Sequence, residues 1–383
     1  MKYLIYLFVI VAFFDMFTQL PIITPMAQSL GAAPFVMGLA VGVYSVSNML
    51  GNVLAGRSID RIGAKKVLIL GLGLTSLILL FYTLVQTGYQ LVMLRFVHGV
   101  TAGLLAPSAF TLMAQTTKAG RQGRDMAQSG AVVGTAAILG PAFSGIVGAK
   151  FGLSWIFLSV SFLMMACALL AGFLVPKELH RPGEVEKKEE ATGGLFFLFK
   201  IRSLVNAYIG CFSVTFTLGI VTYVLPLKVQ LLSLGSAAAG TMISTFGIVA
   251  IAVFLLPTNR IFDRYDPQNL MLIGMIIISL SMAVLASVAE AGLIYGAMGI
   301  FGLGFAFMFP SMNKIIVQTV AEEHRGKAFG VFYALFSLGV IGGSMGVGTL
   351  DLALDAAYLF GAGVVLVLAI LVGRRKYGTR KSK

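Results

Sequence analysis

Apolar runs of about twenty residues alternate with short polar turns along the whole chain. A helix needs about 20 consecutive apolar residues to cross a bilayer, and runs of that length predict twelve membrane spans. In the first half the predicted spans are 3–28, 35–57, 66–87, 90–115, 124–148 and 154–175. In the second half they are 203–227, 237–258, 268–289, 291–315, 326–349 and 355–373.

The second half of the chain echoes the first at a constant offset of 203 residues. The charged stretch 56–66, between spans 2 and 3, returns at 259–265, so that Asp60 falls on Asp263. The same offset pairs Gly71 with Gly274, Gly99 with Gly302, Pro107 with Pro310, Ser108 with Ser311, Gly123 with Gly326, Gly140 with Gly343 and Gly145 with Gly348. We therefore expect an all-α integral membrane protein whose twelve transmembrane helices form two pseudo-symmetric six-helix bundles, 1–175 and 202–383, joined by a polar linker, 176–201.

Composition and charge agree with a membrane protein. Of the 383 residues, 58% are hydrophobic and only 11% are charged, against about 25% charged in soluble domains. All Lys and Arg except Lys150, Lys228 and Arg95 lie at the termini, in the linker or in the turns on one side. This asymmetry predicts a cell-membrane protein with both termini and the linker in the cytoplasm. The net charge of +13 then meets anionic lipid, and no nucleic-acid partner is expected.

The first apolar run predicts a retained helix. It contains Asp15, lacks a small-residue cleavage site and leads directly into another span, unlike a signal peptide.

No motif in the chain indicates an enzyme. It contains no Gly-x-x-x-x-Gly-Lys-Ser/Thr loop for ATP, and its three histidines, His98, His180 and His324, are scattered. No His/Glu or Ser/Lys constellation lies in the spans, so neither catalysis nor a cofactor or metal is expected. Two six-helix halves are typical of secondary transporters, which rock about a central site.

The stretch 56–66 resembles the loop 2–3 signature of the major facilitator superfamily, roughly Gly-x-Leu-Ala-Asp-Arg-x-Gly-Arg-Lys. Asp60, Arg61, Gly63, Lys65 and Lys66 match it. Ser58 replaces a bulkier apolar residue, and Arg57 is an additional charge. The resemblance covers the whole chain, because the spans, the linker and the echo all fit the superfamily.

Three further stretches resemble signatures of subgroups. Residues 94–103 are similar to the Arg-x-x-Gln-Gly pattern of proton-coupled members, with His98 in place of Gln. Residues 134–145 resemble the span 5 signature of twelve-span drug exporters, with Ser144 in place of a glycine. Asp15, followed by Pro25, is similar to the acidic first helix of drug–proton antiporters.

The resemblance implies a gate at the cytoplasmic end. A carboxylate is stabilised at a helix N-terminus, so Asp60 is expected to meet span 11 near Gly326, and Asp263 to meet span 5 near Gly123. The alternative is that these charges only set the topology. The predicted gate residues are Gly56, Asp60, Arg61, Gly63, Lys65, Arg260, Asp263 and Arg264.

Asp15 is the only acid well inside a span. It lies about 18 Å from the cytoplasmic end and Arg95 about 22 Å, so their depths are close. An intramembrane charge costs at least ~2.5 kcal/mol and should face a cavity or a partner. A carboxylate in such a setting can exchange a proton near neutral pH, so we expect Asp15 to take the coupling proton and Arg95 to tune it. A static Asp15–Arg95 ion pair and a direct contact with a cationic substrate are the alternatives.

His98 lies one turn from Arg95 on the same helix face. It is either a packing residue or a proton relay.

Span 5 combines small residues with a proline. Gly130 and Gly134 form a Gly-x-x-x-Gly step that allows close helix approach, and Pro141 bends the helix. Gly140 and Gly145 extend this small-residue face, and span 11 has a similar face made of Gly339, Gly342, Gly343, Gly346 and Gly348. We therefore expect spans 5 and 11 to line the interface between the halves and the bend in span 5 to seal the cavity against proton leak. Ordinary small-residue packing is the alternative.

Polar residues inside the spans are expected to line a substrate cavity. They are Gln19, Asn48, Asn52, Asn206, Tyr223 and Asn313. With few fixed donors and one deep acid, the site suits apolar or cationic compounds.

These features predict a monomeric secondary active transporter whose partners are protons, membrane lipid and a small-molecule substrate. Proton-coupled export of amphipathic or cationic, drug-like compounds by alternating access is the first hypothesis. The alternative is a proton-coupled antiporter for one metabolite, such as a sugar, an amino-acid derivative or a metal chelator. Import by symport is disfavoured by Gly140-Pro141.

Overall fold

The computed structural model describes residues 2–116, 122–176, 195–256, 261–321 and 324–377. Within these ranges the regular structure is entirely helical, with no strand. The first-half helices are α1 (Lys2–Thr18), α2 (Ile23–Ser29), α3 (Pro34–Ile62), α4 (Ala64–Phe81), η1 (Tyr82–Leu84), α5 (Gly88–Ala102), α6 (Leu105–Thr116), α7 (Gln122–Phe151) and α8 (Leu153–Leu174). The second-half helices are η3 (Leu195–Lys200), α9 (Arg202–Leu231), α10 (Ser236–Leu255), α11 (Ile261–Arg264), α12 (Pro267–Ser287), α13 (Ala291–Thr319), α14 (Arg325–Leu350) and α15 (Leu354–Tyr377).

The predicted membrane spans are confirmed. Among the described residues, eleven helical segments are long and apolar enough to cross a membrane, and α1 with α2 forms a twelfth span that is bent by 42°. Local signals fix where several helices begin. Pro34 opens α3 and Pro267 opens α12, where the missing N–H has no intrahelical partner to lose. Thr87 and Gln90 form a capping box at the start of α5.

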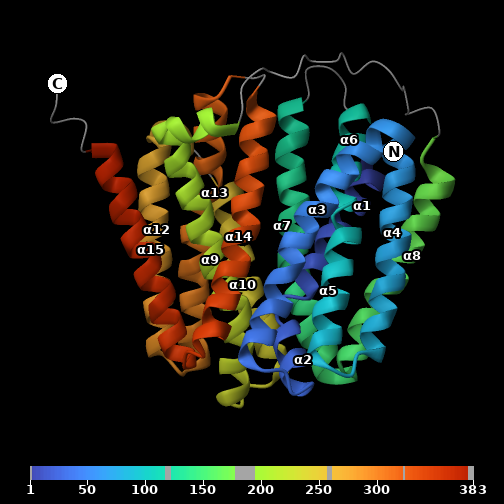
Figure 1. Ribbon diagram of the computed structural model, residues 1–383, viewed down its shortest axis with the longest axis horizontal. Coiled ribbons are helices and arrows are strands. Elements are labelled where there is room, and N and C mark those ends of the chain that lie inside the picture. Colours follow the sequence, from blue (N-terminus) through green and yellow to red (C-terminus); the bar gives the residue numbers. More distant parts are fainter. Residues whose placement is uncertain (1, 117–121, 177–194, 257–260, 322–323, 378–383) are drawn as a thin grey trace.

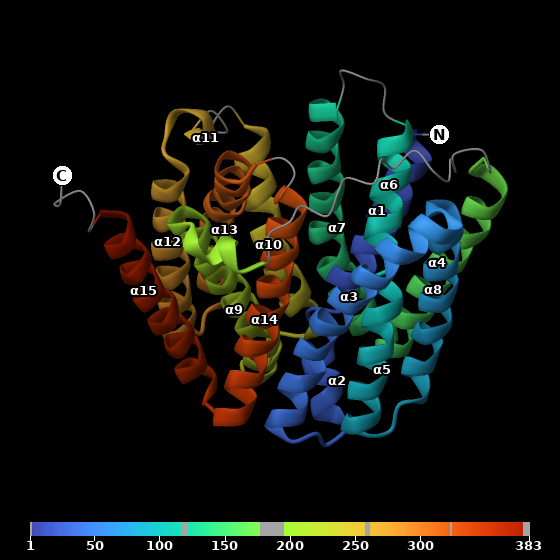
Figure 2. The ribbon, with the colours of Figure 1, turned by 45° about the horizontal axis from the view of Figure 1, so that its top comes forward.

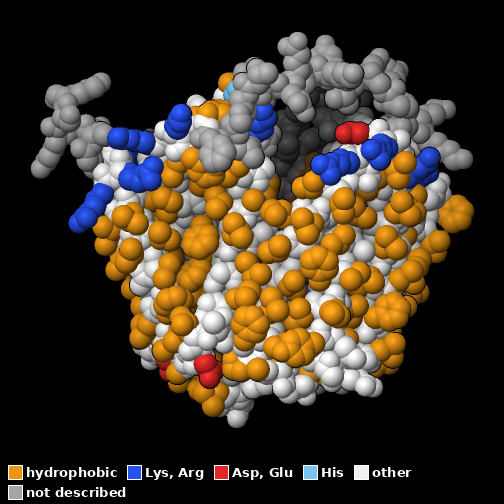
Figure 3. Space-filling view, viewed as in Figure 1, with side chains coloured by type: hydrophobic (Ala, Val, Ile, Leu, Met, Phe, Trp, Pro, Cys, Tyr) orange, Lys and Arg blue, Asp and Glu red, His pale blue; other side chains and the backbone are white. Residues whose placement is uncertain are grey.

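The helices form two side-by-side groups (Figure 1). Helices α1–α8 lie on one side and α9–α15 on the other, and the chain begins and ends at the same end of the molecule. Figure 2, turned so that this end comes forward, shows α7 and α14 beside the boundary between the groups. Lys and Arg side chains gather at this end, while apolar side chains cover the flank below it (Figure 3). We call it the basic end and the other the opposite end.

The two halves use matching glycines for matching helix crossings. A Cβ at Gly99 of α5 would lie 2.6 Å from a backbone oxygen of α3, and a Cβ at Gly302 of α13 would lie 2.5 Å from a backbone oxygen of α10. Gly140 of α7 packs against α1, and Gly343 of α14 packs against α9 in the same way. Each crossing excludes even a methyl group, so the repeat in the sequence is a repeat of packing.

The halves meet along α14 with α3 and along α7 with α10. Near the opposite end, Ser344 Oγ donates to Gly38 O at 3.0 Å and Tyr223 Oη donates to Pro34 O at 3.3 Å. Thr24 Oγ1 of α2 donates to Thr222 O of α9 at 3.2 Å. At the basic end, by contrast, the surface is hollowed between the halves (Figure 3). The structure is therefore closed at the opposite end and open at the basic end.

Candidate functional site

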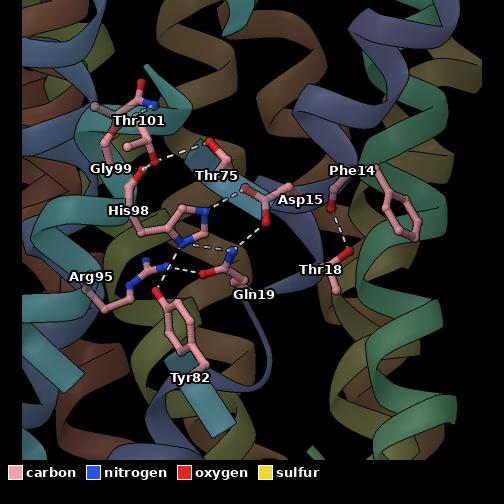
Figure 4. A network of polar contacts seen from close by, with 11 residues as sticks. Phe14, Asp15, Thr18, Gln19, Thr75, Tyr82, Arg95, His98, Gly99 and Thr101 are labelled. Carbon is pink, nitrogen blue, oxygen red and sulfur yellow. Dashed lines mark hydrogen bonds and ion pairs between the residues drawn. The ribbon is translucent and has the colours of Figure 1, made fainter. Parts of the chain in front are cut away.

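A buried polar network surrounds Asp15 in the first half of the molecule (Figure 4). Asp15 lies in the last turn of α1, and Gln19 follows in the break between α1 and α2. Arg95 and His98 come from α5, and Tyr82 comes from η1. Three spans thus bring their polar side chains to one point. The network includes all three residues that the sequence predicts for proton coupling, Asp15, Arg95 and His98.

The break in α1 places Gln19. Pro21 has no N–H, and its ring would clash with the carbonyl of Phe17 in a continuous helix. Phe17 O instead accepts from Leu20 N at 3.3 Å, and the backbone oxygen of Gln19 accepts from Ile22 N and Ile23 N, both at 3.2 Å. The chain leaves the helix for one turn, and the Gln19 side chain turns towards α5.

Each oxygen of the Asp15 carboxylate has a partner. Gln19 Nε2 donates to Oδ1 at 2.8 Å, and His98 Nε2 lies 3.0 Å from Oδ2. Gln19 also accepts from Arg95 Nη1 through its Oε1. Arg95 Nε donates to Ala40 O of α3 at 3.0 Å. The carboxylate and the guanidinium are therefore linked through one amide side chain.

Aromatic rings enclose these groups. The guanidinium of Arg95 lies 4.3 Å from the centre of the Tyr44 ring, in a cation–π arrangement. Tyr82 Oη lies 3.0 Å from His98 Nδ1, and the Tyr82 ring stacks on Phe157 at 4.4 Å. Asp15 and His98 are 0% exposed and Arg95 is 5% exposed. A carboxyl group and a guanidinium are thus held out of water, each with hydrogen-bond partners.

Close packing of α5 on α3 brings Arg95 and His98 to this depth. A Cβ at Gly51 of α3 would lie 2.3 Å from Val100 O, and one at Gly103 of α5 would lie 2.5 Å from Asn48 O. Small residues at the crossing let the two backbones touch. These glycines therefore allow the helix packing that holds the network together, in addition to the match of residues 94–103 to a family signature.

The alternative of a static Asp15–Arg95 ion pair does not describe this conformation. Among the described residues no ion pair joins them, and Gln19 bridges them instead. His98 makes the direct contact with the carboxylate, so its proximity to Asp15 goes beyond packing on the face of α5. Gln19 does not line an open cavity in this conformation, and its role towards a substrate stays a prediction. The Gln19 side chain is 3% exposed, because it is enclosed by the residues that it connects.

The other predicted cavity residues separate into two groups. Asn206 and Tyr223 are buried, so they do not line an open cavity in this conformation. Asn206 Nδ2 donates to Gln268 Oε1 at 3.3 Å, and Tyr223 bonds across the closed end. Three half-buried asparagines make the remaining contacts: Asn48 Nδ2 with Gly99 O at 3.4 Å, Asn52 Nδ2 with Asn48 Oδ1 at 3.2 Å and Asn313 Nδ2 with Phe309 O at 2.9 Å. Their role towards a substrate stays a prediction.

The glycines and the proline predicted for the interface lie along α7. A Cβ at Gly145 would lie 2.8 Å from Ala237 O of α10, and Pro141 O would lie 2.0 Å from a Cβ at Gly240. Gly134 packs against Ile251 of α10. Gly140 faces Phe17 and Thr18 of α1, one turn from Asp15. Gly130 belongs to α7, and its surroundings lie outside the described side chains.

The predicted gate contact between Asp60 and α14 is not formed among the described residues. Gly56, Asp60, Arg61 and Arg264 are exposed, as expected where the halves are apart. Lys65 Nζ donates to Gly172 O at 2.9 Å and to Val175 O, which ties α4 to the end of α8. Gly63 ends α3 with φ +88°, a conformation that favours glycine. Arg260 and the side-chain positions of Asp263, Gly123 and Gly326 lie outside the described residues. The gate stays a prediction for the other conformation.

The sequence analysis missed Tyr82 and Tyr44 and the break in α1. Pro21 was the available signal for the break, since a proline in a helix interior removes a hydrogen bond. Tyr82 follows directly after α4, where aromatic residues are common at the membrane interface. Nothing in the pattern separated Tyr82 from such a residue. For metals, no group of three or more potential ligands occurs among the described residues.

Comparison with known proteins identifies the family. The sequence profile of the Major Facilitator Superfamily matches residues 5–250 and 207–383. The chain belongs to this superfamily. It is a multi-pass membrane transporter and not an enzyme. Among its relatives, Multidrug resistance protein 2 of Bacillus subtilis is 23% identical over 374 residues, covering 94% of this chain and 91% of the relative. The multi-drug resistance efflux pump PmrA of Streptococcus pneumoniae is 27% identical over 324 residues, covering 81% and 78%.

Solved structures share the whole fold of this superfamily member. The nucleoside transporter NupG superposes with a TM-score of 0.81 at 18% identity, covering 98% of both chains. A POT family transporter, solved in complex with a thioalcohol-conjugated peptide, gives a TM-score of 0.80 at 13% identity, covering 100% of this chain and 96% of that one. At these identities the likeness shows the fold alone.

Proposed function

We propose that the protein exports small amphipathic or cationic compounds in exchange for protons, by alternating access. The observation that carries this proposal is the carboxylate of Asp15. It is fully buried, it accepts from Gln19, and it lies 3.0 Å from His98 Nε2. A charged group inside the membrane costs free energy, so an acidic residue that is kept there is a candidate functional site. We further propose that the protein works as a monomer in the cell membrane, with both termini in the cytoplasm.

Protonation changes the charge balance of this network. With Asp15 ionised, its negative charge balances Arg95 across Gln19. A proton on Asp15 leaves the guanidinium without a counter-charge in a low-dielectric site, where charge interactions are strong. A conformation that separates or rehydrates these groups then becomes more favourable. Proton binding shifts the population of the two conformations because it stabilises them unequally.

The direction of transport and the substrate class are supported by the relatives. Two of them are named as a multidrug resistance protein and an efflux pump, and they align over most of this chain. The hollow at the basic end is where cargo from the cytoplasm would enter, if the positive side is cytoplasmic. Drug-like cations are therefore the first substrates to test.

The proposal predicts that Asp15→Asn abolishes uphill export. An amide cannot bind and release a proton, so the variant should bind cargo without coupling to the gradient. We would measure proton flux and dye export in everted vesicles that contain equal amounts of protein. Asp266→Asn is the matched control. Asp266 is an exposed helix cap that asparagine can replace, so export should continue. Full coupling in Asp15→Asn would contradict the proposal.

The same assay separates the two substrate classes. Competition among unrelated cationic dyes supports broad export. Proton flux driven by a single metabolite, with no response to any dye, supports the alternative of a dedicated metabolite antiporter.

A further inference from the structure

Two donors converge on one ring nitrogen of His98. Tyr82 Oη lies 3.0 Å from His98 Nδ1, and Gln19 Nε2 lies 3.4 Å from the same atom (Figure 4). An amide nitrogen only donates, so the Nδ1 atom that it faces is an acceptor. In a neutral ring the hydrogen is then on Nε2, which points at the Asp15 carboxylate at 3.0 Å.

Arg95 fixes the direction of the Gln19 amide. A guanidinium has donors only, so Gln19 must turn Oε1 towards Arg95 Nη1. This leaves Nε2 directed at Asp15 Oδ1, 2.8 Å away, and at His98. The orientation of the amide therefore follows from the fixed charge of Arg95.

We propose that Gln19 and Tyr82 are positioning residues that hold His98 as the Nε2–H tautomer and so direct the coupling proton to Asp15. This inference rests on the proposed function and assigns the proton to one atom group within it. His98 is a hydrogen-bond donor to the carboxylate. A proton on Nδ1 would face the amide donor of Gln19, which Arg95 keeps from turning.

The carboxylate, by contrast, can take the proton. The proton passes from a hydronium ion to Asp15: one O–H bond of hydronium breaks, one O–H bond forms on the carboxyl group, and a water molecule is released. Each carboxylate oxygen has two lone pairs, so the contacts with Gln19 Nε2 and His98 Nε2 leave a free lone pair on either oxygen. A neutral carboxyl group accepts these hydrogen bonds less strongly than a charged one. If the contact with Gln19 opens, the break between α1 and α2 loses its side-chain hydrogen bond to α1. Protonation of Asp15 would then change how the backbone is held at this break.

The groups that face Asp15 support this assignment. Among the described residues, the charged or titratable side chains around it are Arg95 and His98 of α5, Tyr82 of η1 and Tyr44 of α3. Within the described part of the chain Asp15 is the only carboxylate of this cluster, so no second acid of the cluster competes for the proton.

Nitrogen-15 NMR of histidine-labelled protein tests the tautomer directly. The chain has only three histidines, so replacing His180 and His324 one at a time assigns the His98 signals. We expect hydrogen on Nε2 and none on Nδ1 of His98 in the wild type. The double variant Gln19→Leu/Tyr82→Phe should show a mixture of tautomers. Gln28→Leu/Tyr89→Phe, which alters exposed residues, should keep the wild-type signal.

Replacement of His98 separates a donor from a proton carrier. The amide introduced by His98→Gln can still donate to Asp15 but cannot titrate, so proton-coupled export should persist with its pH midpoint unchanged. His98→Leu removes the donor that holds the carboxylate, so proton-coupled export should fall below that of His98→Gln.

The outcomes distinguish this inference from the function on which it rests. Two kinds of result would overturn the assignment of the proton to Asp15. One is an NMR signal that shows hydrogen on Nδ1 or a charged ring. The other is loss of coupling in His98→Gln while Asp15→Asn still couples. Absence of any substrate-driven proton flux in the wild type would overturn the proposed function itself. The NMR signal would still report the tautomer in that case, because it needs no transport.

Discussion

The absence of a side chain at Gly99 allows α5 to pack closely on α3, and this packing determines where Arg95 and His98 lie. A Cβ at this position would lie 1.9 Å from Ser47 Oγ and 2.6 Å from Tyr44 O. The Ser47 hydroxyl can rotate away, but the carbonyl of Tyr44 belongs to the backbone of α3. Any side chain at Gly99 must therefore push α5 away from α3, and it would carry the neighbouring His98 with it.

We predict that Gly99→Ala destabilises the protein by about 1–3 kcal/mol, the usual cost of overpacking. It should also lower proton-coupled transport by more than its loss of folded protein explains. Gly73→Ala is the matched control, since a Cβ at this position in α4 meets nothing within 4 Å. It should be neutral or stabilise by up to about 1 kcal/mol through helix propensity. Thermal unfolding in detergent and transport per folded molecule measure both effects. Equal behaviour of the two variants would show that the crossing tolerates a methyl group.

Lys228 shows how a cation that stands apart from the basic end is accommodated. It lies in the last turn of α9 and is 5% exposed. Its Nζ donates to Leu285 O at 2.6 Å and to Asp355 Oδ1 at 2.8 Å. A buried ammonium needs such partners because an isolated one is costly. The predicted span 203–227 ends just before this residue, whereas in the structure α9 continues past it and buries it inside the second bundle.

At the scale of the elements, the broken span α1–α2 joins the buried network around Asp15 to the closed end of the molecule. Gln19 in the break bonds to Asp15, while Thr24 in the first turns of α2 bonds across the interface to Thr222 O. A movement of the break therefore acts on both. Pro21 maintains the break because it cannot donate to Phe17 O.

We predict that Pro21→Ala weakens coupling while the protein still folds. Alanine restores the missing donor and favours a straighter span, which would pull Gln19 away from Asp15 and Arg95. Pro25→Ala is the matched control. Pro25 lies within the first turn of α2, where a proline removes no intrahelical bond, so transport should change little. Proton-to-cargo stoichiometry in vesicles is the measurement. A stoichiometry that is lost in Pro25→Ala but kept in Pro21→Ala would contradict the hinge.

The elements themselves were largely predictable, and the reasons are physical. Length and hydropathy decide which segments cross a bilayer, and the offset repeat pairs residues such as Gly99 and Gly302 that make equivalent crossings. The candidate site was predictable in part. Asp15, Arg95 and His98 stand out because charge and histidine are rare inside spans. The bridge through Gln19 and the contact of Tyr82 depend on side-chain direction and on the break, which a pattern of apolar residues does not encode.

At the scale of the whole molecule, we propose that two contact surfaces between the halves determine which end is open. The present structure closes the opposite end, where α14 meets α3 at Ser344 and Gly38. The gate predicted around Asp60 lies at the other end of α3, where Asp60 is exposed. A rigid rocking of the halves would exchange one set of contacts for the other, which is the behaviour of transporters built from repeated bundles.

Cysteine accessibility tests this exchange. We predict that Ser344→Cys, in a background with Cys167 and Cys211 replaced by alanine, reacts poorly in intact cells at rest with a maleimide that does not cross membranes. Ser344 is 0% exposed in this conformation. Ser287→Cys, exposed at the end of α12, should react fully, which also tests that the opposite end faces outward. Acid outside the cell should increase labelling at residue 344 if proton binding opens that end.

Asp60→Asn connects this measurement to the predicted gate. If Asp60 stabilises the state that is closed at the basic end, removing its charge should lower the acid-induced labelling of Ser344→Cys. Glu290→Gln is the control, because Glu290 is an exposed acid directly before α13, and it should leave the labelling unchanged. Labelling at residue 344 that is complete at rest would mean that the opposite end is open in the membrane. Labelling that rises with acid but ignores Asp60→Asn would leave rocking in place and reduce Asp60 to a topology signal. Asp60 lies at the basic end of α3, whereas Ser344 of α14 lies near the opposite end. An effect of Asp60→Asn on the labelling of Ser344→Cys would therefore indicate that the halves move as units.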